Sequence, residues 1–426
     1  MKKILALLLA AIMVLSLAAC AGTNNPSTTG GNKPADSKPA DSDKDTVTEI
    51  TLKVWSPAED QVEGGWLVKM EEQFAAAHPE YKINWVNEVC NEGDAGTMVS
   101  TDPSAAADVY MFANDQLGTL VQAGAISRLG GDFLAQVEND NYEKQINTVR
   151  YTDGNIYGFP MTNNTWFMYY NKDVFSEEDV KSLDTMLTKG TVAFNWGTAW
   201  YSGAFFFANG GKLFGDDGLD ASAGIQFGAD NGGFEAALKM TQLAANDNFK
   251  DDQNGLGNAG LKDGSIDAYF SGSWDYNGLY EKLGDKLGAV QPPMVEIGGE
   301  QKQMMSFAGT KAVGVNPNTK NAKAATQFAA YLASVEGQEL RYEMRNVIPC
   351  AKALAESDEI KNNMVAVAEA NTMANASVIQ SSIPEMGNYW APVGNFGGLC
   401  STGAVNADNY KEQVTQMMDT LNKTGL

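Results

Sequence analysis

The feature that most restricts how this chain can fold is an alternation of short apolar strands with amphipathic helices, which begins near residue 49. EITLKVW (49–55) alternates apolar and polar residues as a half-buried strand does, and residues 66–77 carry apolar side chains at helical spacing. YKINWV (81–86) and DVYMF (108–112) continue the strand pattern, and a helical pattern follows the second of them. Strands that alternate with helices predict an α/β fold on a mostly parallel sheet. Ligands of such sheets bind at the carboxyl ends of the strands.

Two loops follow these predicted strands and are candidate ligand loops. Residues 55–60 (Trp-Ser-Pro-Ala-Glu-Asp) leave the first strand, and residues 112–116 (Phe-Ala-Asn-Asp-Gln) leave the third. A second α/β region begins with an aromatic-rich strand within 155–175, continues to strand 304–316 and helix 321–334, and is followed by a mostly helical C-terminal part. At 426 residues the chain is long enough for two domains, each with its own core.

The N-terminus has the pattern of an export signal. Two lysines precede an apolar run over residues 4–19, which is short for a membrane span and typical of a signal peptide. The run ends in Leu-Ala-Ala-Cys, which resembles the lipobox of bacterial lipoproteins. That resemblance implies cleavage after a signal peptide at 1–19 and acylation of Cys20, with an ordinary secretory signal as the alternative. Residues 20–47 would then form a flexible tether, since their composition cannot bury a core.

The net charge of the chain restricts the kinds of molecule that it is expected to bind. Lys and Arg number 30 against 53 Asp and Glu, which gives a formal net charge of −23 at pH 7. Nucleic-acid binding is disfavoured, because a phosphate backbone is bound by a basic face. An acidic surface is typical of a secreted, soluble protein.

Few residues are available for catalysis, cofactors or metals. His78 is the only histidine, so neither a Ser-His-Asp or Cys-His pair nor a His-rich metal site is expected. Cys90, Cys350 and Cys400 lack CxxC spacing and predict either one disulfide or three buried thiols. Residues 255–260 match GxGxxG, but they follow DDQN rather than a predicted strand and open no hydrophobic helix, which argues against a dinucleotide site. The acidic turns lack EF-hand spacing, so we expect no metal and no cofactor, with a bound calcium as the alternative.

Three loop carboxylates leave an enzymatic alternative open. Two carboxylates suffice for glycoside hydrolysis, and Glu59, Asp60 and Asp115 are available for it. Carboxylates in loops are more often solvated or hydrogen-bonded to a ligand. A surface glycosidase is therefore the second hypothesis, behind a binding protein, and an adhesin or structural lipoprotein is the third.

Aromatic residues beside polar neighbours carry the strongest functional signal. In or beside loops lie Trp55, Phe112, Trp166, Trp200, Tyr201, Trp274, Tyr276, Tyr389 and Trp390. A pyranose packs its C–H face on an aromatic ring, and its rim of hydroxyls needs donors and acceptors. Core packing explains any single ring, but the recurrence of the same polar setting favours a sugar-binding site.

Five segments, in order, resemble the extracellular solute-binding proteins of ABC transporters, specifically the maltose and malto-oligosaccharide group. They are ADVYMFANDQLGTLVQAGAI, DGNIYGFPMTNNTWFMYYNKDVF, FFFANGGKLF, AYFSGSWDY and IPEMGNYWAPV, and the resemblance runs from about Glu49 to the C-terminus. It implies a two-lobed periplasmic-binding-protein-like fold, with hinge crossings and a ligand cleft between the lobes. The N-terminal lobe would comprise 48–160 plus 303–352, and the C-terminal lobe 163–300 plus 355–426.

The resemblance also implies a set of ligand-binding residues. The family's stacking aromatics match Phe112, Trp200, Trp274 and Trp390, and its polar contacts match Glu59, Asp60, Asp115, Gln116, Asn164 and Thr198; Trp166, Tyr201 and Tyr276 complete the expected set. Basic residues of the enterobacterial maltose binders correspond here to Asp60, Gln116 and Gly394, and two cleft glutamates correspond to Asn164 and Thr198. A ligand held more by stacking than by charge favours malto-oligosaccharides longer than maltose.

The expected protein is a monomeric, non-enzymatic receptor on the extracellular face of the cell membrane, attached through its lipid only. It would close over a malto-oligosaccharide and deliver it to the permease subunits of an ABC importer driven by a cytoplasmic ATPase. Another neutral oligosaccharide, such as an isomaltose-type or other α-glucan fragment, is the alternative ligand.

Overall fold

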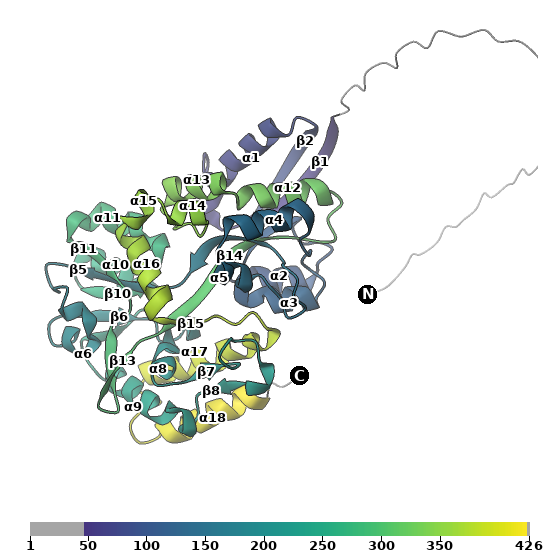
Figure 1. The fold of residues 1–426 in the computed structure, drawn as a ribbon. Helices are drawn as coiled ribbons and strands as arrows, with labels where there is room; N and C mark the ends of the chain where they lie inside the picture. Colours follow the sequence, from purple (N-terminus) through teal and green to yellow (C-terminus); the bar gives the residue numbers. More distant parts are fainter. Residues whose placement is uncertain (1–46, 424–426) are drawn as a thin grey trace, which may run out of the picture. The chain divides into compact units, whose positions relative to one another are not determined.

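The computed structural model describes residues 47–423, so the expected signal peptide, Cys20 and nearly all of the tether lie outside the described residues. Two open sheets, each covered by helices, make up the described part of the chain (Figure 1). This arrangement confirms the mixed α/β, two-lobed fold. The residue boundaries expected for the lobes stay a prediction. Within residues 47–423, no helix combines the length and apolar character that a membrane span requires.

The first lobe is built on a sheet with the strand order β15-β14-β3-β1-β2, in which β4 also pairs with β14. Its strands are β1 (Thr48–Ser56), β2 (Tyr81–Val89), β3 (Val109–Ala113), β4 (Phe159–Asn164), β14 (Ser306–Val315) and β15 (Ser377–Ile379). β1 is parallel to β2 and β3, whereas β14 is antiparallel to β3 and β4. The carboxyl ends of β1 and β3 therefore meet at one edge, where both predicted ligand loops begin.

Helices of the first lobe pack on this sheet. They are α1 (Trp66–Ala77), α2 (Ala95–Thr101), α3 (Leu117–Gln122), α4 (Gly131–Asp140), α5 (Glu143–Thr148), α12 (Ala322–Leu332) and α13 (Val335–Arg345). The core contains Leu52 and Val54 of β1 and Phe74 of α1, as their alternating and helical spacings predict. The expected end of α1 at the His78-Pro79 step is also confirmed.

The second lobe is built on a sheet with the order β11-β5-β10-β6-β9. Its strands are β5 (Phe167–Asn171), β6 (Val192–Phe194), β9 (Phe249–Asp251), β10 (Ala268–Ser271) and β11 (Leu287–Val290). Met168 and Tyr170 of β5 enter one buried core, while Phe167 and Tyr169 enter another. Both faces of this sheet are thus covered, since successive residues of a strand point to opposite faces.

The remaining elements surround this second sheet or connect it to the first. The helices are α6 (Leu183–Met186), α7 (Ala199–Ser202), α8 (Ala204–Ala208), α9 (Gly233–Ala244), α10 (Leu256–Asp263), α11 (Tyr276–Leu283), α14 (Lys352–Ala355), α15 (Asp358–Lys361), α16 (Met364–Asn375), α17 (Gly387–Ser401) and α18 (Tyr410–Lys423). Two hairpins complete the list, β7 (Lys212–Leu213) with β8 (Ile225–Gln226) and β12 (Met294–Ile297) with β13 (Glu300–Gln303).

The chain crosses between the lobes in adjacent segments. β4 of the first sheet passes into β5 of the second through Thr165 and Trp166. Phe307, the second residue of β14, lies in the core of the second lobe, and Val313 of the same strand lies in the core of the first. The hydroxyls of Thr165 and Ser306 lie 2.9 Å apart, so the two crossings run side by side.

Two local expectations are corrected. The context expected for residues 255–260 is corrected in part: the 3-10 turn Gln253–Gly255 separates them from β9, which ends at Asp251, but a helix, α10, does begin at Leu256. The Asp252 carboxylate accepts a 2.6 Å hydrogen bond from the Gly257 amide at the start of α10. A side-chain anion therefore occupies the helix N-terminus, where a pyrophosphate would bind. The aromatic-rich strand within 155–175 is two strands, because the chain changes sheets between β4 and β5.

The structure decides between one disulfide and three buried thiols, the two alternatives for the cysteines of the described residues. Cys90, Cys350 and Cys400 are free, buried thiols, without a disulfide in the part of the chain that the structure describes. Burial raises the pKa of the Cys400 thiol to about 12, so it stays protonated and unreactive at neutral pH.

Candidate functional site

A cavity of about 470 Å³ lies between the two lobes. It is lined by Glu92, Gly93, Ala113, Asp115, Asn164, Thr198, Trp200, Trp274, Lys311, Gln380 and Trp390. A second cavity of about 210 Å³ shares Glu92, Trp274 and Lys311 with the first, and its other lining residues include Glu59 and Asn163. We call the two cavities together the cleft. Both lobes contribute side chains to it, as a ligand site between lobes requires.

Trp274 stands between the two cavities and is held there by the turn that follows β10. Asp275 accepts hydrogen bonds from the Ser271 hydroxyl at 2.6 Å and the Tyr269 hydroxyl at 2.8 Å, which fixes the short 3-10 turn Ser273–Asp275. The indole folds back over Gly272, where a Cβ atom would lie only 2.0 Å from the ring. Trp274 keeps 40% of its surface exposed, which is unusual for the largest apolar side chain.

Two further tryptophans extend this aromatic surface. The Trp200 ring stacks on Trp274 with centroids 5.9 Å apart and an interplanar angle of 29°. Trp390, on α17, packs on Phe307 with centroids 5.7 Å apart. The Tyr389 hydroxyl donates a 2.8 Å hydrogen bond to the Ala199 carbonyl and so ties α17 to α7, which carries Trp200. The three rings line a single cavity from three separate elements.

Polar atoms without partners lie among these rings. The Asp115 Oδ1, Gln380 Oε1 and Trp200 Nε1 atoms are buried and have no hydrogen-bond partner among the described residues. Burial raises the pKa of the Asp115 carboxyl to about 6, and the Gln380 side chain acts in the opposite direction. Buried polar groups are nearly always hydrogen-bonded in proteins, so these two acceptors and one donor, on residues that line the cavity, are candidate partners for ligand hydroxyls.

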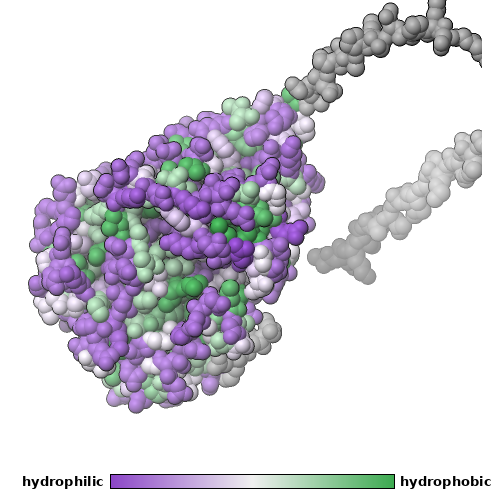
Figure 2. All heavy atoms as spheres, viewed as in Figure 1, coloured by the Kyte–Doolittle hydropathy of each residue, from purple (hydrophilic) through white to green (hydrophobic). Residues whose placement is uncertain are grey.

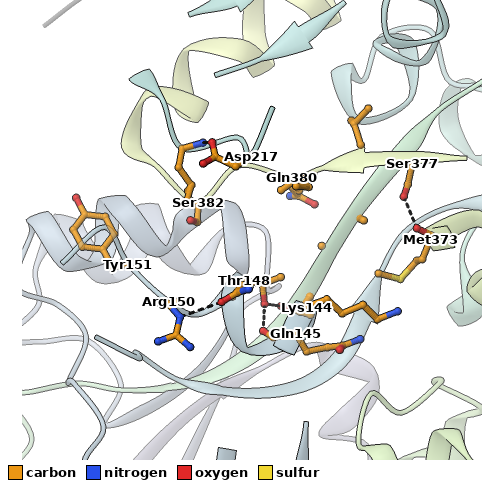
Figure 3. A pocket seen from close by; sticks show the side chains of 17 residues that line it. Lys144, Gln145, Thr148, Arg150, Tyr151, Asp217, Met373, Ser377, Gln380 and Ser382 are labelled. Atoms are coloured by element: carbon orange, nitrogen blue, oxygen red, sulfur yellow. Dashed lines mark hydrogen bonds between the residues drawn. The ribbon is translucent and has the colours of Figure 1, made fainter. Parts of the chain in front are cut away.

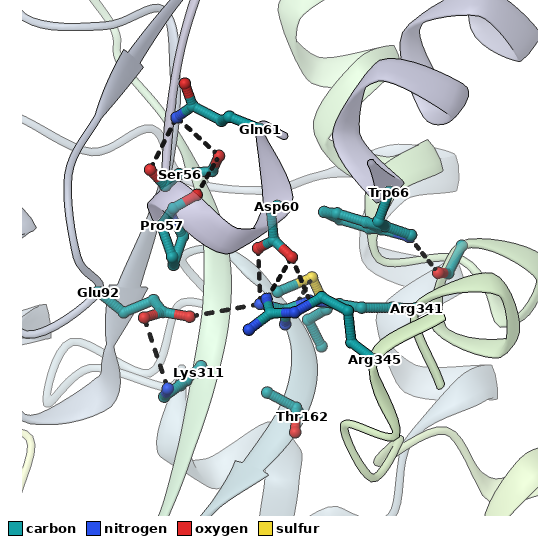
Figure 4. A network of polar contacts seen from close by, with 12 residues as sticks. Ser56, Pro57, Asp60, Gln61, Trp66, Glu92, Thr162, Lys311, Arg341 and Arg345 are labelled. Atoms are coloured by element: carbon teal, nitrogen blue, oxygen red, sulfur yellow. Dashed lines mark hydrogen bonds and ion pairs between the residues drawn. The ribbon is translucent and has the colours of Figure 1, made fainter. Parts of the chain in front are cut away.

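A chain of ion pairs forms the wall beside the smaller cavity (Figure 4). Asp60 is fully buried and pairs with Arg341 at 2.8 Å and also with Arg345. Arg341 also reaches Glu92 at 3.5 Å, and the Lys311 ammonium lies 3.4 Å from the other Glu92 oxygen. Burial opposes the ionisation of Glu92, but the Lys311 and Arg341 charges outweigh it and hold the pKa of this carboxyl below its usual value.

Seven of the thirteen expected ligand-binding residues line the cleft. They are Glu59, Asp115, Asn164, Thr198, Trp200, Trp274 and Trp390. They come from loops or element ends that are far apart in the sequence, and the fold brings them to the space between the lobes. Their contact with a ligand stays a prediction.

Three of the other expected residues are core or structural residues in this structure. Phe112 is completely buried in the first core, because β3 is covered on both faces. Trp166 is completely buried in the second core and donates a 2.7 Å hydrogen bond to the Trp200 carbonyl. Asp60 serves the ion pairs with Arg341 and Arg345. None of the three lines the cleft in this structure, and their contact with a ligand stays a prediction.

Two of the last three expected residues, Gln116 and Tyr201, lie beside the cleft rather than in its lining. Gln116 binds the backbone of Gly93 and Gly96 and so joins the loop after β3 to α2. The Tyr201 ring packs between two tryptophans. Its centroid lies 5.4 Å from that of Trp166 and 5.3 Å from that of Trp200, so Tyr201 supports the Trp200 ring of the cleft.

Tyr276 points to a different core. Its ring stacks on the ring of Tyr280, also on α11, with centroids 5.3 Å apart. The Tyr276 side chain packs against the buried core that contains Phe167 and Tyr169 of β5.

Sequence reasoning missed Glu92, Lys311 and Gln380. A single lysine inside the apolar strand 304–316 was a usable signal for Lys311, whereas neither Glu92 nor Gln380 stands out in the sequence.

Another cavity, of about 550 Å³, is a different space (Figure 3). It is lined by α5, β14 and β15, together with Asp217 and Leu219, and it shares only Gln380 with the cleft. Figure 2 shows apolar residues gathered in the middle of the face on which β15 lies, with hydrophilic residues around them. Tyr151 is the only aromatic side chain in its lining. A pyranose packs its C–H face on aromatic rings, and the cleft offers three tryptophans, so the cleft is the better candidate site.

The described residues hold no cluster of three or more His, Cys, Asp or Glu side chains placed to bind a metal ion. Glu92 and Lys311 of the cleft are paired with each other, whereas the Asp115 carboxyl has no ion-pair partner among the described residues. The site therefore offers aromatic stacking, hydrogen bonds and paired charges, which is the chemistry of a polar, uncharged ligand with apolar faces.

Comparison with known proteins gives a consistent result. The model of the bacterial extracellular solute-binding proteins matches residues 69–367. A solved structure with acarbose is 43% identical in sequence, covers 88% of this chain and 100% of its own, and superposes with a TM-score of 0.85. A maltooligosaccharide ABC transporter solute-binding lipoprotein of Streptococcus pneumoniae is 25% identical over 86% of each chain. A galactooligosaccharide-binding protein of Bacillus subtilis is 24% identical over 97% of this chain and 96% of its own.

Proposed function

We propose that this chain, which belongs to the bacterial extracellular solute-binding proteins, captures malto-oligosaccharides and delivers them to an ABC importer. One observation carries the proposal: Trp200, Trp274 and Trp390 line a single cavity between the lobes, next to the unpaired Asp115 Oδ1. Glucosyl rings would stack on the indoles, and their hydroxyls would supply the missing hydrogen bonds. The similar protein with acarbose and the similar maltooligosaccharide-binding lipoprotein support this ligand class.

Capture depends on closure of the lobes. Trp200, Trp274 and Trp390 belong to the second lobe, whereas Asp115 and Glu92 belong to the first. A sugar contacts both sets only when the cleft is shut, so the ligand stabilises the closed form through its differential contacts. The closed form is then the one that the permease recognises.

The ligand is longer than maltose. The cleft comprises cavities of about 470 and 210 Å³ with Trp274 between them, which suits a chain of several glucosyl rings. A galacto-oligosaccharide is the second candidate, favoured by the similarity to the Bacillus subtilis protein. An axial hydroxyl on galactose changes the apolar face that meets an indole, so the two ligands are distinguishable by affinity.

The function is binding without turnover. A glycosidase needs two free carboxylates that flank the scissile bond. Asp60 is fully buried in ion pairs with Arg341 and Arg345, which removes one of the three carboxylates considered for this chemistry. Incubation with maltohexaose should yield no shorter product by chromatography; release of glucose or maltose would refute this part of the proposal.

The protein is anchored outside the cell through lipid on Cys20 and acts as a monomer. The Leu-Ala-Ala-Cys pattern after an apolar run supports the anchor, and residues 20–47 supply the tether to the two lobes. Mass spectrometry of the mature protein from a bacterial host should find an acylated N-terminal cysteine. Release of wild-type protein into the medium, as expected of Cys20→Ala, would refute the anchor.

Thermal unfolding across a sugar panel tests the ligand class. The panel contains glucose, maltose, maltotriose to maltoheptaose, isomaltose, cellobiose, raffinose and a β-galacto-oligosaccharide. A ligand at 100 times its Kd stabilises the folded state by about 2.7 kcal/mol, which is a clear shift in the unfolding temperature. Maltotriose and its longer homologues should give the largest shifts. A shift with the galacto-oligosaccharide alone would reassign the ligand, and no shift with any sugar would refute the proposal.

A further inference from the structure

The side chain of Lys311 extends across the cleft from the first lobe to Trp274 of the second. The Lys311 side chain comes from β14, opposite Ala113 of β3 and Thr162 of β4. Its ammonium lies 5.4 Å from the centroid of the Trp274 ring, which follows β10 of the other sheet. This distance is within the range of a cation–π contact. Lys311 also lines both cavities of the cleft.

The first lobe holds this ammonium in a defined position. The pairing of β14 with β4 shifts register between Lys311 and Ala312, an irregularity of the kind that redirects a neighbouring side chain. Glu92, only 6% exposed, pairs with Lys311 through one oxygen and with Arg341 through the other. Arg341 is in turn fixed by the buried Asp60. The ion-pair chain thus anchors Lys311 to the rigid sheet.

Lys311 has unused capacity for hydrogen bonds. A lysine ammonium has three donors, and Glu92 is its only ion-pair partner among the described residues. The ammonium lies 3.4 Å from Glu92 and 5.4 Å from the centroid of the Trp274 indole, and its side chain lines both cavities of the cleft, so donors that Glu92 does not use are within reach of a ligand there.

We propose that Lys311 is a specificity-determining residue that donates hydrogen bonds to the hydroxyl edge of the glucosyl ring stacked on Trp274. This inference rests on the proposed function and adds to it the residue that links the sugar to both lobes. The indole binds the apolar face of the ring from the second lobe, and the ammonium binds its hydroxyls from the first. Lys311 therefore selects rings with free hydroxyls at this position and favours the closed form when one is bound.

Titration calorimetry with maltotriose tests the role of Lys311. Lys311→Met keeps the length of the side chain and removes the donors, so we expect Kd to rise about 10- to 100-fold, the effect of losing a hydrogen bond to a charged group. Lys311→Arg keeps a cation with donors and should recover part of the affinity. Lys282→Met, an exposed lysine at the end of α11, is the matched control and should bind as the wild type does.

A double variant separates ligand binding from neutralisation of Glu92. Lys311→Met leaves a buried carboxylate short of one partner, so its unfolding temperature is measured as well. In Glu92→Gln/Lys311→Met both charges are absent, and we expect maltotriose binding to stay weak. Recovery of wild-type affinity in this variant, or unchanged affinity in Lys311→Met alone, would overturn the inference while the proposed function stands. Wild-type protein that does not bind maltotriose would overturn both.

Discussion

Replacing Trp274 with alanine tests the stacking surface directly. A tryptophan buries up to about 250 Å² when fully covered. Since 40% of Trp274 is exposed, roughly 100 Å² of it is free for a ligand by that measure. A glucosyl ring covers one face of the indole, which is half of this area or more. At about 25 cal/mol per Å² the stacking contact contributes about 1 to 2.5 kcal/mol to binding.

The expected change in affinity follows from this range. Trp274→Ala should raise the Kd for maltotriose about 5- to 70-fold, because each 1.4 kcal/mol corresponds to a factor of ten. Titration calorimetry at 25 °C measures it. The unfolding temperature of the unliganded variant should change little, since 40% of the side chain is already exposed in the cleft.

A matched control comes from the same helix region. Tyr280, on α11, is 45% exposed and does not line the cleft, so Tyr280→Ala should leave the Kd unchanged. An equal loss of affinity in both variants would indicate a general disturbance of α11 rather than a lost stacking contact. Wild-type affinity in Trp274→Ala would refute the assignment of Trp274 as a ligand platform.

Three further predictions concern stability, pH and the turn below the indole. Asp60→Asn leaves Arg341 buried without its main anion and should lower the free energy of unfolding by about 3 to 5 kcal/mol in urea titrations; a loss below 1 kcal/mol would show that the ion pair is dispensable. Burial raises the pKa of Asp115 to about 6, so a sugar that hydrogen-bonds to the ionised carboxylate must displace a proton at low pH. Maltotriose should therefore bind roughly tenfold more weakly at pH 5 than at pH 7.5, and Asp115→Asn should abolish this dependence in calorimetry. Gly272→Ala places a Cβ atom 2.0 Å from the Trp274 ring and should displace the indole, so that its effect on the Kd for maltotriose matches that of Trp274→Ala; unchanged binding would mean that the ring is held by other contacts.

Much of the fold was predictable because its signals are local. Leu52 and Val54 alternate with polar residues, and α1 has apolar residues at helical spacing, so both elements follow from periodicity. The strand-end loops with Asp115 and Trp274 were also predictable, since turn-forming small residues leave few side chains able to cover them.

The direction of aromatic residues in fully covered strands was not predictable. All five residues of β3 are buried, so no alternation distinguishes the two faces of this strand. Phe112 therefore gave no indication of whether it faces the cleft or the core. Trp166 presented the same difficulty, because the chain changes sheets at that residue.

The charged wall of the cleft depends on contacts between distant parts of the chain. Asp60 and Arg341 are 281 residues apart in the sequence. Lys311 reaches Glu92 only because the register of β14 against β3 and β4 puts it there. No local pattern encodes such a register, so the sequence presents Asp60 as a loop carboxylate and gives no indication of its ion pair with Arg341.

The place of β14 in the molecule has a consequence for how the protein is made. A chain synthesised from its N-terminus completes β3 at Ala113 long before β14 appears at Ser306, and β15 follows only at Ser377. Until then the first sheet has an open edge at β3, with unpaired backbone groups that pair readily with other chains. Pairings between such distant segments also form slowly. Folding of the first lobe therefore waits for the last third of the chain, and a fragment that ends before Ser306 should aggregate rather than fold.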